Sequence, residues 1–173
     1  NRKTTKKQKD VKGRLERLTK YTDLTMERYN LYVSKSGNKS NTESKSIKDF
    51  KITKDLVSRI MTTESGGDPE AVSPNGLFFG LFQLSQDALN KLYSGAFSKW
   101  NDPVTNIDAA IKFWHTYVIP ELTGKNSVAL QLNRDSHFNF YMIFQQGGRG
   151  YRAIITKFKN PNTKNSLVSK KGY

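Results

Sequence analysis

Glu64 is a candidate general acid. It ends a stretch in which apolar residues recur at helical spacing, and Ser65-Gly66-Gly67 follows it directly. The apolar run Leu77-Phe78-Phe79 comes soon afterwards and could shield the carboxyl group from water. A carboxylic acid donates a proton near neutral pH only where a desolvated site raises its pKa. These residues therefore indicate acid catalysis in a partly buried groove.

A glutamine in a glycine-rich loop is the second group that could do chemistry. Gln83 lies in the segment Gly80-Leu81-Phe82-Gln83-Leu84, and its amide offers both a donor and an acceptor to sugar hydroxyls or an N-acetyl group. Gly76 and Gly80 would allow a ligand to approach the backbone closely. In isolation, a glutamate beside two glycines is more often a surface helix end. The combination with the glutamine loop favours a site that cleaves glycosidic bonds.

Helices are predicted to position these groups. A helix that runs to Glu64 is predicted, and Gly66-Gly67 and Pro69 end it. One face of this helix is formed by Ile47, Phe50, Leu56, Val57, Ile60 and Met61. We find little period-two alternation, so strands are minor. The further helices predicted are 85–93 with Ser85 as N-cap, one from Asp102-Pro103 to before Pro120, 135–146 and 150–158.

The first 46 residues differ from the rest. Residues 1–9 are basic and polar, and residues 34–46 contain no large apolar side chain and read as a linker. Between them lies a helical pattern with a rough apolar stripe. That stripe consists of Val11, Leu15, Leu18, Leu24, Met26 and Leu31. The sequence therefore predicts a basic N-terminal segment over 1–46, made of a helix and a polar linker, followed by the main domain over 47–173.

Composition limits the partners. The 173 residues carry a formal net charge of +14, which favours anionic partners such as nucleic acid, an acidic membrane face or an anionic wall polymer. The absence of cysteine excludes disulfides and thiolate chemistry. No apolar run indicates a transmembrane helix, and no targeting signal is visible. Because the chain begins with Asn1 rather than Met, we expect a processed product or an excised fragment.

The glutamate and glutamine segments resemble the lytic transglycosylases that share the goose-type lysozyme fold. The first family pattern is Glu-Ser, then an Ala and a Ser, then Gly-x-x-Gly-Leu-x-Gln followed by an aliphatic residue. This chain has three residues between Gly76 and Gly80, where the family pattern has two. A later family element, a helix beginning Asp-Pro-x-x-Asn-Ile, is matched by Asp102-Pro103-Val104-Thr105-Asn106-Ile107. The residues that match the first family pattern are Glu64, Ser65, Ala71, Ser73, Gly76, Gly80, Leu81, Gln83 and Leu84.

A fourth family element departs from its pattern. Where the family has Ala-Tyr-Asn-x-Gly, this chain has Ile143-Phe144-Gln145-Gln146-Gly147. Gln145 keeps the amide with a longer reach, and Tyr141 or Tyr151 could replace the hydroxyl that Phe144 lacks. The departure concerns substrate contacts more than the acid. The resemblance covers roughly residues 47–158.

The resemblance implies a mainly α, lysozyme-like domain that cleaves the β-1,4 bond between N-acetylmuramic acid and N-acetylglucosamine in peptidoglycan. Glu64 would act as acid and then as base, forming a 1,6-anhydro ring without a second carboxylate, a metal or a cofactor. The implied substrate contacts are Ser73, Phe79, Gln83, Tyr141, Gln145 and Gly147. The implied location is the cell wall or periplasm, or a phage virion or secretion machine that opens the wall.

Three other interpretations stay open. A hydrolytic muramidase would need a water-positioning group, for which Asp68, Glu70, Asp87 and Asp102 are candidates that more often serve structure. The altered fourth element favours a weakly active glycan-binding assembly module. Specific nucleic-acid binding rests on charge alone, because residues 1–20 carry nine Lys or Arg without interleaved aromatics. Neither His115 nor His137 has a partner at metal-ligand spacing.

Overall fold

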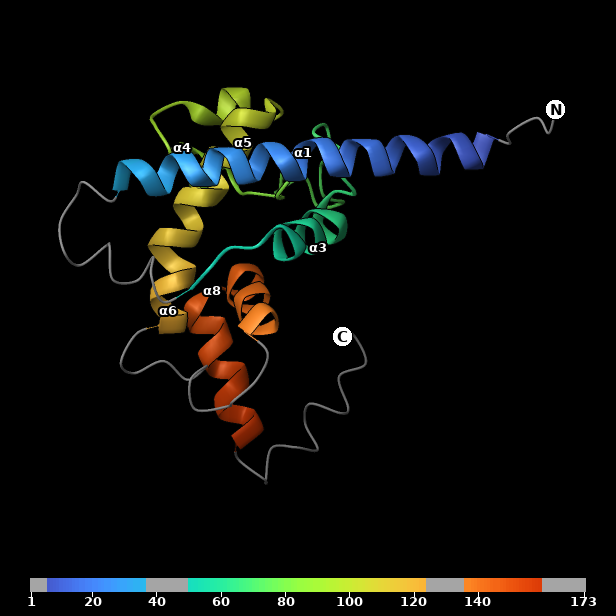
Figure 1. Ribbon diagram of the computed structural model, residues 1–173. Coiled ribbons are helices and arrows are strands. Elements are labelled where there is room, and N and C mark those ends of the chain that lie inside the picture. The colour runs from blue at the N-terminus through green and yellow to red at the C-terminus, as the bar shows by residue number, and fades with distance from the viewer. Residues whose placement is uncertain (1–5, 37–49, 124–135, 160–173) are drawn as a thin grey trace. The chain divides into compact units, whose positions relative to one another are not determined.

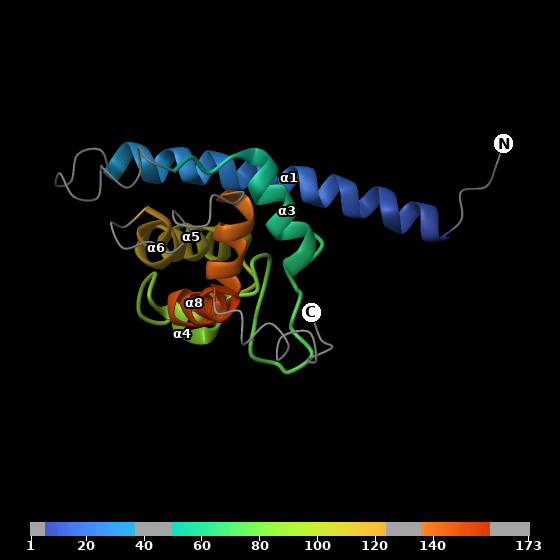
Figure 2. The same cartoon turned by 90° about the horizontal axis from the view of Figure 1, so that it is seen from below.

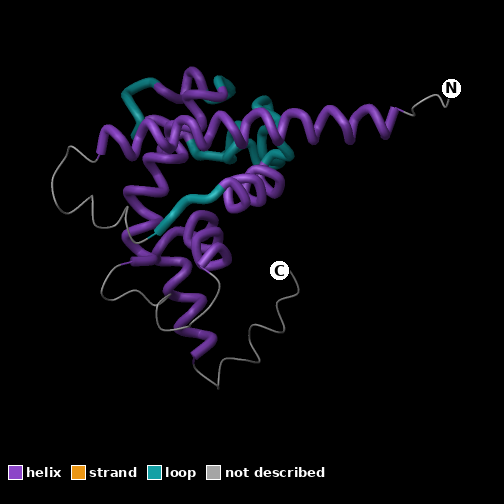
Figure 3. The backbone as a smooth tube through the Cα atoms, in the orientation of Figure 1, coloured by secondary structure: helices purple, strands orange, loops and turns teal. Residues whose placement is uncertain are grey.

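The computed structural model describes residues 6–36, 50–123 and 136–159. The chain is mainly helical in these ranges, as predicted (Figure 3), and its extended pairing is limited there to two isolated antiparallel bridges. It divides into two compact units, Asn1–Phe113 and Trp114–Tyr173. The predicted boundary at residue 46 and most of the predicted linker lie outside the described residues.

In the first unit, helix α1 (Lys6–Ser36) packs against α3 (Lys54–Glu64) and α5 (Pro103–Phe113). The N-terminal turns of α1 continue past the end of α3 (Figures 1 and 2). The buried face of α1 consists of Leu18, Thr22, Thr25 and Tyr29, which recur at helical spacing.

This face corrects the apolar stripe predicted for the N-terminal helix. Val11, Leu15 and Leu31 are 53%, 60% and 42% exposed, whereas Thr22 and Thr25 are buried. The reason is tertiary: packing against α3 and α5 decides which side of α1 is buried, and Val11, Leu15 and Leu31 do not lie on that side. Helix α1 therefore combines an apolar surface with the basic charge of its N-terminal half.

Helix α3 begins later than the sequence predicts, because Phe50, expected on its apolar face, lies before the N-cap, and Ile47 lies outside the described residues. Thr53 is its N-cap, and the side-chain oxygen of Thr53 accepts a hydrogen bond from the Leu56 amide at 3.2 Å. Its buried residues are Leu56, Val57, Ile60 and Met61. The helix ends at Glu64, as predicted.

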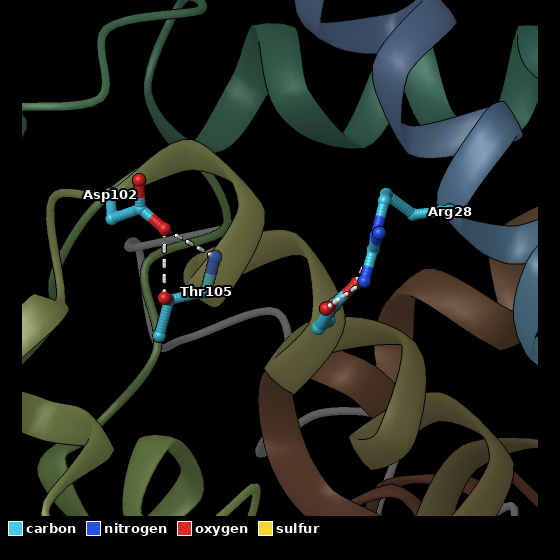
Figure 4. Close-up of polar contacts among 4 residues, drawn as sticks. Arg28, Asp102 and Thr105 are labelled. Atoms are coloured by element: carbon cyan, nitrogen blue, oxygen red, sulfur yellow. Dashed lines mark hydrogen bonds and ion pairs between the residues drawn. The ribbon is translucent and has the colours of Figure 1, made fainter.

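The remaining elements of the first unit are short or strongly capped. Helix α4 (Gln86–Asn90) begins at the predicted N-cap Ser85 but ends earlier than expected, and a 3-10 turn, η1 (Ala96–Lys99), follows. Asp102 caps α5, accepting hydrogen bonds from the amide and the hydroxyl of Thr105 at 3.0 and 2.8 Å (Figure 4).

The second unit begins with a π turn, η2 (Trp114–Val118), and continues with α6 (Ile119–Thr123) and α8 (Ser136–Lys159). Pro120 lies in the first turn of α6, so the predicted stop before it is wrong. A first-turn proline is tolerated because its missing N–H has no partner to lose. Within α8, Gly147 has a non-helical φ of 70°. It separates two helical stretches that correspond to those predicted at 135–146 and 150–158.

Candidate active site

Glu64 is half-buried at the C-terminal end of α3. The apolar residues one turn before it, Ile60 and Met61, are fully buried and anchor the helix end in the first unit. The carboxyl group is therefore carried by a rigid element, and its backbone cannot move without displacing buried side chains.

The turn after Glu64 is held by its own backbone. The amides of Ser65 and Gly66 both donate to the Met61 carbonyl at 3.0 Å, and the Ser65 hydroxyl accepts from the Gly67 amide at 3.1 Å. Gly66 and Gly67 adopt φ values of 64° and 80°, a region that other residues enter at a cost. The two glycines therefore let the chain reverse directly behind the acid.

Residues 71–84 form a compact loop around Phe79. Its backbone exchanges both hydrogen bonds with Leu84 at 3.0 Å, and Phe79 also forms an isolated bridge to Val72. The Gly80 amide donates to the Ala71 carbonyl at 2.8 Å. The Phe79 ring packs against Phe97 and Trp100, with centroid distances of 4.9 and 5.4 Å. Phe79 and Trp100 thus belong to one aromatic cluster at the base of the loop.

The other two residues of the apolar run predicted to shield the acid lie on the surface. Leu77 is 61% exposed and Phe78 is 41% exposed. They offer apolar surface to solvent at the tip of the loop, of the kind on which a sugar ring can pack.

Ser73 organises the tip of this loop. Its hydroxyl donates to the Asn75 side chain at 2.6 Å and accepts from the amides of Leu77 and Phe78 at 3.3 and 3.0 Å. These bonds use the hydrogen-bonding capacity of the hydroxyl within the turn. In this structure Ser73 therefore shapes the loop that presents Leu77 and Phe78.

The side-chain amide nitrogen of Gln83 is hydrogen-bonded to the backbone. Its Nε2 donates to the carbonyls of Ala71 and Gly80, both at 3.0 Å, and its φ of 49° is positive. The amide nitrogen has two hydrogens, so both are used. The side-chain carbonyl oxygen is the part of Gln83 that remains to receive a ligand hydroxyl or amide.

Asn106 holds the glutamine loop, a role that the sequence reasoning missed. It is 1% exposed, its Nδ2 donates to the carbonyls of Phe79 and Trp100 at 3.0 and 3.1 Å, and its Oδ1 accepts from the Phe82 amide at 3.0 Å. A Cβ atom on Gly80 would collide with the Asn106 side chain. The Asp-Pro-x-x-Asn-Ile motif contains Asn106 and could have indicated its role. An asparagine at this position is also common at the start of a helix, so the motif alone does not distinguish the two roles.

Three of the four carboxylates considered for positioning water accept structural hydrogen bonds, and the fourth lies at a helix start. Asp68 accepts from the Glu70 amide at 2.9 Å, and Glu70 accepts from the Asn101 side chain at 3.0 and 3.1 Å. Asp102 caps α5, and Asp87 lies in the first turn of α4, where an acid is favourable. These contacts match the structural roles expected of them.

The fourth-element residues lie in the second unit. The Tyr141 hydroxyl accepts a hydrogen bond from Gln145 Nε2 one turn further along α8, and Gly147 ends that helical stretch. Trp114 packs edge-on against Phe140 and Phe144, with centroid distances of 5.7 and 6.1 Å. Phe144 thus contributes apolar packing to Trp114.

The described residues contain no group of three or more His, Cys, Asp or Glu side chains suited to hold a metal ion. Burial lowers the pKa of His115 to about 4, so this histidine is neutral near pH 7.

None of the described helices is long and apolar enough to cross a membrane.

Comparison with known families gives one match. Residues 41–119 match the model of the transglycosylase SLT domain, slightly less than half of the chain. The match includes Glu64, Gln83 and Asn106, and it leaves α1 and α8 outside. No curated protein and no solved structure gives a significant match. The mainly helical structure agrees with the all-α fold of this family.

Proposed function

We propose that the protein is a peptidoglycan lytic transglycosylase with Glu64 as its acid and base, because residues 41–119 match the model of the transglycosylase SLT domain. The family match supports peptidoglycan as the substrate class. The structural observation that best supports Glu64 as the acid is its position. It is a half-buried carboxyl group at a helix end, inside the matched stretch and followed by a tightly bonded turn.

In the first step, protonated Glu64 gives its proton to the glycosidic oxygen between the muramoyl C1 and the N-acetylglucosamine O4. The C1–O4 bond breaks, the leaving sugar departs with a neutral 4-hydroxyl group, and positive charge develops at C1. The substrate's own N-acetyl oxygen stabilises this charge. A second protein carboxylate is not needed for this step, unlike in the usual two-carboxylate scheme.

In the second step, the Glu64 carboxylate removes the proton of the muramoyl C6 hydroxyl. The O6 atom bonds to C1, the 1,6-anhydro ring closes, and Glu64 is again protonated for the next turnover. No water is consumed, so the atoms of the substrate are all found in the two products. This mechanism fits a site in which Asp68, Glu70 and Asp102, the carboxylates considered for positioning water, accept structural hydrogen bonds.

The loop 71–84 is proposed to hold the sugar beside the acid. Gln83 would accept a hydrogen bond from a sugar hydroxyl or N-acetyl N–H through its carbonyl oxygen, since its Nε2 is bonded to Ala71 and Gly80. Ser73 and Phe79 would act by shaping the loop, and Phe78 offers exposed apolar surface. Tyr141, Gln145 and Gly147 of the second unit are proposed as further substrate contacts.

The setting proposed is outside the cytoplasm, at the cell wall or in the periplasm, or as part of a virion or secretion machine that opens the wall locally. The net charge of +14 favours retention near anionic wall polymers. Within the chain, residues 47–173 would form the catalytic part and residues 1–46 a basic extension.

Digestion of purified peptidoglycan tests the function. The wild type should release muropeptides about 18 Da lighter than hydrolysis products, since ring closure replaces water addition, and Glu64→Gln should release none. Reducing-end products from the wild type would show a hydrolytic muramidase instead. Binding of peptidoglycan without soluble products from either protein would favour a glycan-binding module, the alternative that Phe144 and Gln145 in the fourth element support.

A further inference from the structure

The two glycines behind Glu64 lie directly against α1. A Cβ atom on Gly66 would be 3.0 Å from Arg14 Nε, and one on Gly67 would be 3.0 Å from the Leu18 backbone nitrogen. Arg14 and Leu18 are one helical turn apart on α1. The turn behind the acid is therefore packed against a helix that lies outside the matched stretch 41–119.

Arg14 also reaches the last turn of α3. Its Nη2 donates a long hydrogen bond of 3.5 Å to the Thr62 carbonyl. The last turn of α3 contains no basic residue of its own. A cation at this end of a helix offsets the negative end of the helix dipole. Arg14 thus supplies from α1 the positive charge that the last turn of α3 lacks, and it contacts the chain on both sides of Glu64.

The same helix is fixed to the element that holds the glutamine loop. Arg28 of α1 forms a two-pronged ion pair with Asp108 of α5, with distances of 2.8 and 2.6 Å (Figure 4). Asp108 lies close to Asn106 on α5, and Asn106 holds Phe79 and Phe82 of the loop. Helix α1 therefore braces both α3, which carries the acid, and α5, which holds the loop of Gln83.

We propose that α1 is a working part of the active site and that Arg14 is a positioning residue for Glu64. This inference rests on the proposed function. Arg14 acts through Thr62 and Gly66, which flank the acid, and it fixes the direction in which the Glu64 side chain leaves the helix. Proton transfer depends on that direction, because a misplacement of about 1 Å can lower a rate about a hundredfold.

Three variants of the full chain test the role of Arg14. Arg14→Met keeps an apolar stem but removes the guanidinium, Arg14→Lys keeps the charge, and Arg17→Met is the matched control on an exposed position of the same helix. Arg14→Met should lower kcat for release of anhydro-muropeptides about tenfold, with KM unchanged. Arg14→Lys should restore part of that loss, and Arg17→Met should match the wild type. Equal activities for Arg14→Met and Arg17→Met would overturn the positioning role.

A double-mutant cycle tests the contact itself without relying on catalysis. Gly66→Ala is strained by its φ of 64° and also approaches the Arg14 guanidinium. Its shift of the urea midpoint should therefore be smaller in the Arg14→Ala background than in the wild type. Equal shifts in the two backgrounds would overturn the contact. If the wild type itself releases no anhydro-muropeptides, the proposed function fails and the catalytic role of Arg14 fails with it. Activity that is insensitive to Arg14 removes the positioning role alone.

Discussion

Asn106 and Phe82 are joined by a buried hydrogen bond of 3.0 Å that ties the glutamine loop to α5. The other end of the same side chain donates to the carbonyls of Phe79 and Trp100. One asparagine therefore bonds to three backbone groups, of which the Phe79 carbonyl also accepts from the Leu84 amide. The loop can be irregular, with Gln83 at positive φ, because α5 supplies these further hydrogen bonds.

Replacing Asn106 by alanine should detach the glutamine loop from α5 and lower the stability of the protein. The change removes the hydrogen bonds of this side chain to the backbone of Phe79, Phe82 and Trp100, so we expect a loss of about 3 kcal/mol in the free energy of unfolding. Urea denaturation measures it. Asn101→Ala is the matched control, because Asn101 is exposed and bonds to the Glu70 side chain. A loss of less than about 1 kcal/mol for Asn106→Ala would contradict the role of Asn106.

Two glycines of the same loop should differ sharply in their tolerance of alanine. Gly76 has a φ of 70°, and nothing lies within 4 Å of the place that a Cβ atom would take there, so Gly76→Ala should cost only backbone strain of about 1 kcal/mol. Gly80 has a φ of 77°, and its Cβ would lie 2.8 Å from the Trp100 carbonyl oxygen as well as against Asn106. We expect Gly80→Ala to lose both stability and activity, and urea denaturation with the peptidoglycan assay checks both. Similar losses for the two variants would show that the close packing of Gly80 on α5 is absent in solution.

Local signals in the sequence predict the end of α3 and the starts of α4 and α5, but not the start of α3 or the end of α4. Helix α3 ends at Glu64, where two glycines follow it. Helices α4 and α5 are capped by Ser85 and Asp102, whose short polar side chains reach nearby amides. Interactions between distant segments were not predicted. Thr22 and Thr25 are buried against expectation because neighbouring helices select the inner face of α1. The role of Asn106 in holding the loop is not predicted because the three backbone groups that it bonds are separated from it in sequence.

The ion pair between Arg28 and Asp108 should contribute more than the pair that joins Asp23 of α1 to Lys54 of α3. The hydrogen bonds to Asp108 raise the pKa of Arg28, and the two side chains are 31% and 25% exposed. We expect Arg28→Met to cost about 1–2 kcal/mol, since it strands a partly buried carboxylate. Lys54→Met removes the pair with Asp23, whose side chains are 63% and 55% exposed, and should cost less than about 0.5 kcal/mol. Equal losses in urea denaturation would contradict the idea that Arg28 braces α5.

His115 should make the second unit sensitive to mild acid. Burial lowers the pKa of His115 from 6.5 to about 4, so the unfolded chain binds a proton more readily than the folded one between these values. The contribution of neutral His115 to stability is therefore fully present above about pH 6.5 and is lost progressively as the pH falls towards 4. The measurement is the free energy of unfolding across this range, followed by tryptophan fluorescence, to which Trp114 beside His115 and Trp100 both contribute. His115→Gln removes the titrating group and should flatten the decline relative to the wild type. Parallel pH profiles for the two proteins would mean that the acid sensitivity comes from carboxylates elsewhere in the chain.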